Sequence, residues 1–417
     1  MSNVVIITLG CKQNKYESDC MAGVLERAGY TVSQDMQFAD IYIINTCAVT
    51  SEAEKKSRQY IEKCNKQNPD CKIIVCGCAS ENNIEQFKFK KNVYSVIGTE
   101  GKQNILDYIS NVVLEKNQLS LNYNSPVSPI KTTTRENVKI QDGCNNFCSY
   151  CLIPYLRGRS RSRDLQDILD EVSNIASRSH EIVLTGIDIS SYSIDGKPAL
   201  HILMQELSKF NVLVSIGSLE VGVITEELMK VLVRMPNFSP HFHLSLQSGD
   251  DEILKKMNRH YTTKEFYEKV CLIREYFPNA NLTTDVIVGF GMETDAQFEN
   301  TKNFIIKCGF SYVHIFPYSK REGTRAYNMP DLTSDIKKSR VEKLKQVNEK
   351  LKLEYLNKFI GEHSIMLAEE KKDYWEGFST QYIRCYCDSE LQQGIRYNIE
   401  FIEQYLDGMK VKILEEI

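Results

Sequence analysis

The sequence predicts an α/β protein in three parts: an N-terminal open parallel α/β domain, a central partial (βα)6 barrel and a small all-β barrel at the C-terminus. Two stretches of the chain alternate apolar strands with helices, which is the pattern of parallel sheets. The last 60 or so residues instead contain short strands separated by turns. Because 417 residues exceed one compact core, we expect domains at residues 1–121, 135–355 and 357–417.

The first domain is predicted from three apolar strands and the helices between them. The expected strands are residues 4–9, 41–44 and 72–75, and the expected helices are residues 18–27, 55–64 and 105–114. Residues 122–134 are rich in Pro, Ser, Thr and Asn, which is typical of a linker.

The central domain is predicted from a second, longer alternation. Its expected strands are residues 138–141, 182–185, 212–216, 243–246, 284–288 and 312–316, and its expected helices include residues 165–176, 226–234, 264–276 and 296–307. Six such units fall short of the eight of a closed barrel, so we expect a partial one. A long charged helix over 334–357 leads to the final strands, expected at 364–368, 382–386, 397–402 and 409–413.

Composition limits the classes of function. The formal net charge is −4, so nucleic-acid binding must rest on local basic patches. The chain contains no apolar run of about 18 residues and starts without a basic signal-peptide region, so we expect a cytoplasmic protein that does not bind membranes. Fourteen cysteines in a protein of that compartment indicate metal binding or catalysis rather than disulfides.

Cys144, Cys148 and Cys151 form the most specific motif, C-x3-C-x2-C, directly after a predicted strand. Three thiolates on one loop can hold three irons of a [4Fe–4S] cluster and leave the fourth open to a chelating ligand. The alternatives are a zinc site or coincidence, but zinc usually takes four ligands. The loop lies at the C-terminal end of a barrel strand, where such folds carry out chemistry.

Cys11, Cys47 and Cys78 each follow the C-terminal end of one of the three N-terminal strands. In an open parallel sheet those ends share one crevice, so the three thiols are expected to meet and to hold a second cluster. The alternative is that they are ordinary buried cysteines. Cys71 and Cys76 compete for the third place, but Cys78 lies beyond the strand end and is better placed to reach across.

At these residues the chain resembles the methylthiotransferases, a family of radical S-adenosylmethionine (SAM) enzymes. The segment with Cys144 resembles the radical SAM signature, and the resemblance extends over essentially the whole chain through the strings LGCKQNKYESD, INTCAVT, KIQDGCNNFCSYCLIPYLRGRSRSR, EIVLTGIDI, HFHLSLQSGDDEILKKMNRHYT, TDVIVGF and HIFPYSKREGT. The C-terminal barrel is similar to the TRAM domain of that family.

The resemblance implies two [4Fe–4S] clusters and SAM as cofactors. The cluster on Cys144, Cys148 and Cys151 would bind SAM and cleave it to a 5′-deoxyadenosyl radical. The cluster on Cys11, Cys47 and Cys78 would hold the sulfur that, after methylation by a second SAM, is inserted into a C–H bond. Implied partners are the tRNA anticodon loop, an electron donor such as flavodoxin or ferredoxin, and a sulfur source.

The string from Gly10 to Ser18, GCKQNKYES, resembles the branch that acts on threonylcarbamoyladenosine. This predicts methylthiolation of C2 of N6-threonylcarbamoyladenosine at position 37 of tRNA. Alternatives in the same family are isopentenyladenosine in tRNA and an aspartate of a ribosomal protein. An alternative of another class is a non-catalytic iron–sulfur redox or RNA-binding protein.

Gly186, Glu220 and Gln247 are predicted to bind SAM, because each lies at or near a strand end facing the same mouth. The alternative for them is barrel packing. Three basic runs also follow strand ends. Because they could surround one opening of the central barrel, we expect them to contact RNA phosphates. The residues are Arg157, Arg159, Arg161, Arg259, Lys320 and Arg321. Beyond the cluster ligands, the sequence predicts no catalytic residue.

Overall fold

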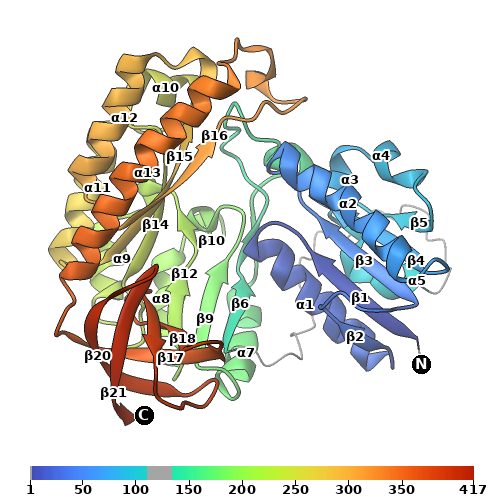
Figure 1. Cartoon of the computed structure of the whole chain (residues 1–417), viewed down its shortest axis with the longest axis horizontal. Coiled ribbons are helices and arrows are strands. Elements are labelled where there is room, and N and C mark those ends of the chain that lie inside the picture. The colour runs from blue at the N-terminus through green and yellow to red at the C-terminus, as the bar shows by residue number, and fades with distance from the viewer. Residues whose placement is uncertain (1, 110–133) are drawn as a thin grey trace.

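A computed structural model describes residues 2–109 and 134–417 of the chain. The N-terminal domain lies beside the central barrel, and the C-terminal barrel packs at the far end of the central barrel (Figure 1). Most of the predicted linker at 122–134, the end of the predicted helix at 105–114 and the domain boundary at 121 lie outside the described residues.

The N-terminal domain is the predicted open parallel sheet, with strand order β2-β1-β3-β4-β5. Its strands are β1 (Asn3–Thr8), β2 (Thr31–Ser33), β3 (Ile41–Thr46), β4 (Lys72–Gly77) and β5 (Val93–Val96). Its helices are α1 (Lys12–Arg27), α2 (Ser51–Gln67), α3 (Cys78–Asn82), α4 (Glu85–Lys88) and α5 (Ile105–Ile109). Strand β3 is buried throughout because helices cover both faces of the sheet.

Several features of this domain were not predicted, among them the two edge strands and the start of α1. Strands β2 and β5 lie at the two edges of the sheet and are short and only partly buried, so their apolar signal is weak. Helix α1 starts at Lys12, six residues earlier than expected, because the polar residues Gln13 and Asn14 are buried in a domain interface rather than exposed in a loop.

The central domain is the predicted partial barrel. Its principal strands are β6 (Arg135–Lys139), β9 (Glu181–Thr185), β12 (Leu213–Ile216), β14 (His241–Gln247), β15 (Asn281–Val288) and β16 (Tyr312–Pro317). The third strand breaks at Gly217: β12 pairs with β9, whereas the short continuation β13 (Ser218–Leu219) pairs with β14. Among the described strands, β6 and β16 each have one neighbour, so the barrel is open between them.

The outer helices of this barrel are α7 (Leu165–Ala176), α8 (Leu200–Leu207), α9 (Glu226–Leu232), α10 (Asp251–Lys256), α11 (Thr263–Tyr276) and α12 (Asp295–Cys308). The remaining pieces are α6 (Ile153–Leu156), β7 (Gln141–Asp142), β8 (Arg161–Ser162), β10 (Ser193–Ile194) and β11 (Lys197–Pro198). One continuous apolar core joins the inner side chains of the helices to the strands.

Helix α13 (Ser334–Asn357) leads into a closed five-stranded barrel with the order β17-β18-β19-β21-β20. Its strands are β17 (His363–Lys371), β18 (Trp375–Ser379), β19 (Arg384–Cys387), β20 (Arg396–Tyr405) and β21 (Gly408–Glu416). Four strands were predicted; β18 was missed because its sequence, WEGFS, lacks a clear alternation. None of the helices in the described part of the chain is long and apolar enough to cross a membrane.

Candidate functional site

Cys11, Cys47 and Cys78 lie at one edge of the N-terminal sheet. Cys11 immediately precedes α1, Cys47 follows β3, and Cys78 begins α3 directly after β4. The pKa of the Cys47 thiol is raised to about 11, mainly by burial and to a smaller extent by the nearby Cys11 and Cys78. Gly10 permits this approach: its φ is +97°, and a Cβ there would lie 2.6 Å from Cys47 Sγ.

Neither competitor for the third place reaches this edge. Cys76 is fully buried in the apolar core with Ile6, and Cys71 lies near Cys64 at the opposite end of β4. Of the three cysteines, Cys78 is the one that lies beside Cys11 and Cys47.

Cys144, Cys148 and Cys151 lie on the loop that follows β7. Burial raises the pKa of Cys144 to about 11 and that of Cys151 to about 12, and the charge of Cys148 adds to both shifts. Phe147, within this loop, has a φ of 47°, which is rare for a bulky residue and marks a tightly held turn.

Each triad meets N–H donors aimed at its sulfurs. The backbone N–H of Asn146 donates to Cys144 Sγ at 3.4 Å, and that of Ile153 donates to Cys151 Sγ at 3.4 Å. Arg259 Nη1 donates to Cys148 Sγ at 3.2 Å. At the other triad, the N–H of Val49 donates to Cys47 Sγ at 3.5 Å. Such hydrogen bonds to sulfur are a means by which proteins tune iron–sulfur clusters.

The spacing of the thiols fits a cluster better than a single zinc ion. Among the described residues, only His243, Asp285 and His314 bring three ligand atoms within 4.8 Å of one another. Two thiolates bound to one zinc ion can be at most about 4.6 Å apart, twice the Zn–S distance. Neither cysteine triad brings its three sulfur atoms within that distance of one another, which is the wider spacing that a cluster needs.

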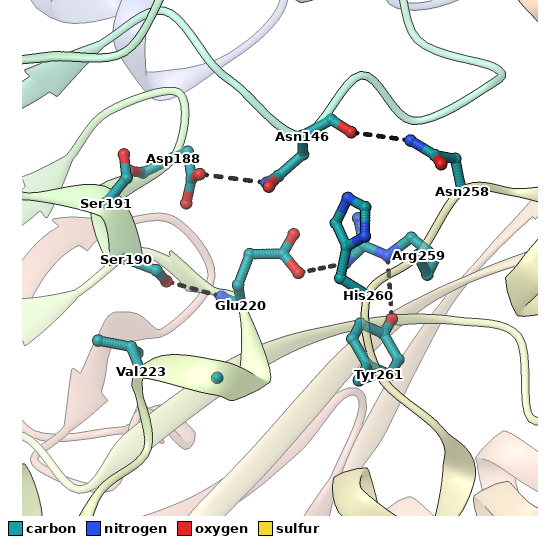
Figure 2. A pocket seen from close by; sticks show the side chains of 11 residues that line it. Asn146, Asp188, Ser190, Ser191, Glu220, Val223, Asn258, Arg259, His260 and Tyr261 are labelled. Atoms are coloured by element: carbon teal, nitrogen blue, oxygen red, sulfur yellow. Dashed lines mark hydrogen bonds and ion pairs between the residues drawn. The ribbon is translucent and has the colours of Figure 1, made fainter.

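A pocket of about 260 Å³ opens beside the central triad (Figure 2). Glu220 lines it and forms an ion pair with Arg259, which also contacts Cys148. Asn146 donates from Nδ2 to Asp188 Oδ2 at 3.1 Å, so the cluster loop itself forms one wall. Burial, aided by the nearby negative charge of Glu220, raises the pKa of Asp188 to about 6.

Of the three residues predicted to bind SAM, only Glu220 lines this pocket. At Gly186 an added Cβ would lie 2.8 Å from Ile189 Cγ2 and 2.9 Å from the Gln141 carbonyl oxygen, which favours the packing alternative. Gln247 ends β14 with a φ of 66°, a strained backbone near the same mouth. Asp188 was missed, although it follows a strand end in the string EIVLTGIDI.

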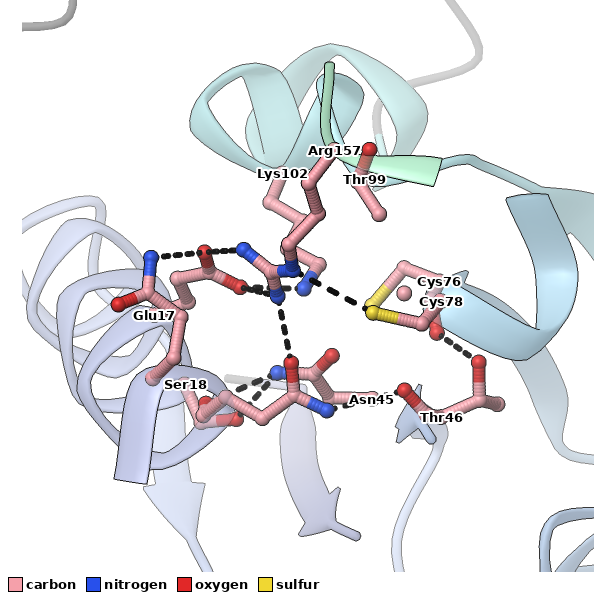
Figure 3. Close-up of polar contacts among 12 residues, drawn as sticks. Glu17, Ser18, Asn45, Thr46, Cys76, Cys78, Thr99, Lys102 and Arg157 are labelled. Carbon is pink, nitrogen blue, oxygen red and sulfur yellow. Dashed lines mark hydrogen bonds and ion pairs between the residues drawn. The ribbon is translucent and has the colours of Figure 1, made fainter. Parts of the chain in front are cut away.

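A buried charge network joins the loop of the central triad to Cys78 of the N-terminal triad (Figure 3). Arg157 Nη1 donates to Glu17 Oε1 at 2.7 Å and to Asp142 Oδ2 at 3.3 Å, and its Nε donates to Cys78 Sγ at 3.3 Å. Lys102 and Lys139 also pair with Glu17. Arg157 belongs to the loop of the central triad, whereas Glu17 and Cys78 belong to the N-terminal domain, so this network fixes the two domains to each other.

The basic residues predicted to contact RNA fall into two groups. In the first group, the side chains are buried in ion pairs: Arg157 with Glu17, Arg259 with Glu220, and Arg321 with Glu54. In this conformation these three arginines stabilise the protein instead of facing a phosphate. The reason is topological, since each lies at a domain or pocket boundary. Arg159 is exposed and its guanidinium lies 4.5 Å from the centre of the Phe147 ring, whereas Arg161 and Lys320 are half-buried.

An open parallel barrel with a cysteine triad after its first strand defines a radical SAM enzyme. The Radical SAM superfamily model matches residues 138–305, and the model described as "Uncharacterized protein family UPF0004" matches residues 3–98. Among solved structures, the radical SAM methyltransferase TsrM from Kitasatospora setae has a TM-score of 0.57 at 14% identity, covering 78% of this chain and 77% of its own. That likeness shows the fold alone.

Curated relatives give the family. Threonylcarbamoyladenosine tRNA methylthiotransferase MtaB of Bacillus subtilis is 33% identical over 100% of this chain and 98% of its own length. MtaB of Aquifex aeolicus is 35% identical over 90% and 95%, and tRNA-2-methylthio-N(6)-dimethylallyladenosine synthase of Staphylococcus haemolyticus is 33% identical over 88% and 76%. The chain belongs to the radical SAM methylthiotransferase family, whose cofactors are SAM and two [4Fe–4S] clusters.

Proposed function

We propose that this protein methylthiolates C2 of N6-threonylcarbamoyladenosine at position 37 of tRNA. The full-length similarity to relatives of that name carries the proposal. The two cysteine triads, joined across a domain interface, support it, because sulfur insertion needs a radical and a sulfur at one carbon.

We assign the cluster ligands residue by residue. Cys144, Cys148 and Cys151, in the domain of residues 135–355, are proposed to hold the cluster that binds SAM. Cys11, Cys47 and Cys78, in the domain of residues 1–121, are proposed to hold the second. When bound, the first cluster supplies the electron that cleaves SAM, and the second supplies the site of the inserted sulfur.

The chain's own residues position these groups. Glu220 and Asp188 place carboxylates beside the central triad, where they can bond the hydroxyls or the ammonium of SAM. Arg259 fixes Glu220 and also donates to Cys148, so cofactor pocket and cluster loop share one support. The domain of residues 357–417 and the exposed Arg159 are proposed to contact tRNA. The reductant would come from an electron donor of the flavodoxin or ferredoxin type, and the sulfur from a separate sulfur source.

The test is mass spectrometry of tRNA nucleosides made by the reconstituted enzyme. Purified tRNA carrying threonylcarbamoyladenosine should gain a methylthio group when SAM, sulfide and reductant are supplied. Parallel tRNA carrying the dimethylallyl group should not. Product only on the dimethylallyl tRNA would replace the proposed substrate by that of the Staphylococcus relative.

A further inference from the structure

A second pocket, of about 720 Å³, lies on the inner face of β14, β15 and β16. Lys12 of α1, His241 and Thr283 of the central barrel, and Tyr382 of the C-terminal barrel all line it, so every domain contributes. It shares no lining residue with the pocket beside the central triad. Its volume is in the range of pockets that bind small organic groups.

Lys12 brings a positive charge to this pocket. In the described part of the chain, no hydrogen bond or ion pair engages its ammonium group. The nearby cation Arg135, by contrast, is paired with Glu181 and Glu369. Lys12 is exposed at the rim of the pocket, and a cation without a protein partner can pair with an anion, so the pocket favours a ligand that carries a negative group.

One wall of the pocket is held in place by ring stacking and hydrogen bonds. The ring of Tyr382 stacks on His241, with centroids 4.6 Å apart and planes 6° apart, and Tyr382 has a φ of 61°, so the surrounding structure holds it in an unfavourable backbone conformation. His243 bonds Thr283 Oγ1 through Nδ1 at 2.9 Å and Asp285 Oδ2 through Nε2 at 3.2 Å. This wall offers hydrogen-bonding partners for hydroxyl and carbamoyl groups.

We infer that this pocket binds the N6 group of the substrate base and that Lys12 pairs with its carboxylate. The inference rests on the proposed function and names the residue that selects the substrate. Lys12 directly follows Cys11, so the pocket begins beside the N-terminal triad. In adenine, C2 and the carbon that carries N6 flank the same ring nitrogen, so a group on N6 lies next to the place where C2 receives sulfur.

The chemistry of the two candidate substrates differs at this point. A threonylcarbamoyl group ends in a carboxylate and a hydroxyl. A dimethylallyl group has neither, so it would gain no ion pair with the Lys12 ammonium. Lys12 therefore acts as a specificity-determining residue through substrate binding.

The test compares reconstituted wild type, Lys12→Met, Lys12→Arg and the control Lys15→Met. Lys15 is on the same helix but pairs with Asp19 instead of lining the pocket. The substrates are anticodon stem–loops carrying threonylcarbamoyladenosine or its analogue in which the carboxylate is an uncharged amide. Both kcat/KM for methylthiolation and the Kd of the stem–loop are measured, and iron content and melting temperature report folding.

Lys12→Met should lose about 10- to 100-fold in kcat/KM and in affinity for the carboxylate substrate, the size of a lost charged hydrogen bond. Wild type should lose as much on the amide, and Lys12→Met should no longer distinguish the two. Lys12→Arg should restore much of the discrimination, and Lys15→Met should behave as wild type.

If Lys12→Met still prefers the carboxylate as strongly as wild type, or if its kcat/KM falls equally on both substrates, this inference is wrong while the proposed function stands. If wild type modifies neither stem–loop, the proposed function fails as well.

Discussion

Arg157 donates a hydrogen bond from Nε to Cys78 Sγ over 3.3 Å, although the two residues belong to different domains. Arg157 lies six residues after Cys151, on the loop that carries the central triad. A guanidinium beside a thiolate stabilises negative charge on the sulfur. This contact therefore couples the electronic state of one triad to the backbone that carries the other.

Replacing Arg157 should change the redox behaviour of the N-terminal cluster. In a background with Cys144, Cys148 and Cys151 changed to Ala, Arg157→Met should shift the reduction potential of the remaining cluster to a more negative value, because a cationic donor to sulfur is lost. Electron paramagnetic resonance during a redox titration measures the shift. Arg159→Met, from the same basic run but exposed, is the control, and an unchanged potential in Arg157→Met would show that the bond to Cys78 has no electronic effect.

The two triads should have separable roles. The protein should hold about eight irons after anaerobic reconstitution, and either triple Cys→Ala variant should retain about half. The variant lacking Cys11, Cys47 and Cys78 should still cleave SAM to 5′-deoxyadenosine and should form no methylthio product. Chromatography of both products tests this, and product formation by that variant would remove the N-terminal cysteines from the sulfur site.

The sequence predicted the meeting of Cys11, Cys47 and Cys78 because strand ends in a parallel sheet converge whatever the side chains do. It could not predict the fate of Arg157, since a basic run shows charge but not burial. Its partner Glu17 lies 140 residues away, and only the domain packing brings them together.

The same limit explains the unpredicted pocket residues. Lys12 was recognised only as part of a branch motif, because its place depends on β14, on β15 and on a loop of the C-terminal barrel. Tyr382 was assigned to a strand because aromatic residues favour strands, whereas its positive φ places it before β19. In both cases long-range contacts, and not local propensity, determine where the residue lies.

Glu220 should be needed for SAM cleavage. Glu220→Gln keeps the size of the side chain but removes the charge that pairs with Arg259 and lies in the pocket. A lost charged hydrogen bond of about 1.5–3 kcal/mol corresponds to a roughly 10- to 150-fold loss in kcat/KM for cleavage. Glu227→Gln, on the exposed face of the following helix, is the matched control and should have no effect. Equal rates for Glu220→Gln and wild type would separate Glu220 from cofactor binding.

Binding of tRNA should depend on the accessible basic residues. Arg159→Ala and Lys320→Ala should each weaken binding and reduce the slope of log K against log salt concentration by about 0.7–0.9 if each contacts one phosphate. Lys209→Ala, at an exposed residue just after α8, should leave the slope unchanged. Fluorescence anisotropy at four salt concentrations measures it, and a common slope for all variants would place the RNA elsewhere.

Glu17 should stabilise the domain interface in a manner that depends on pH. Burial alone would raise its pKa, but Arg157, Lys102 and Lys139 outweigh that effect and hold the pKa well below its usual value. A carboxyl with a lower pKa in the folded state than in the unfolded state contributes its full stabilisation above the unfolded value, near pH 4.3, and loses it as the pH falls through the folded value. Glu17→Gln should therefore lower the free energy of unfolding at pH 7 by about 3–5 kcal/mol, the cost of removing one partner of a buried pair. The difference from wild type should shrink as the pH falls below about 4.

Urea denaturation followed by circular dichroism at pH 7, 5 and 3.5 measures both effects, with the exposed Glu26→Gln of the same helix as control. If the two variants lose the same stability, or if the Glu17→Gln difference does not change with pH, the three cations do not hold Glu17 as this structure indicates.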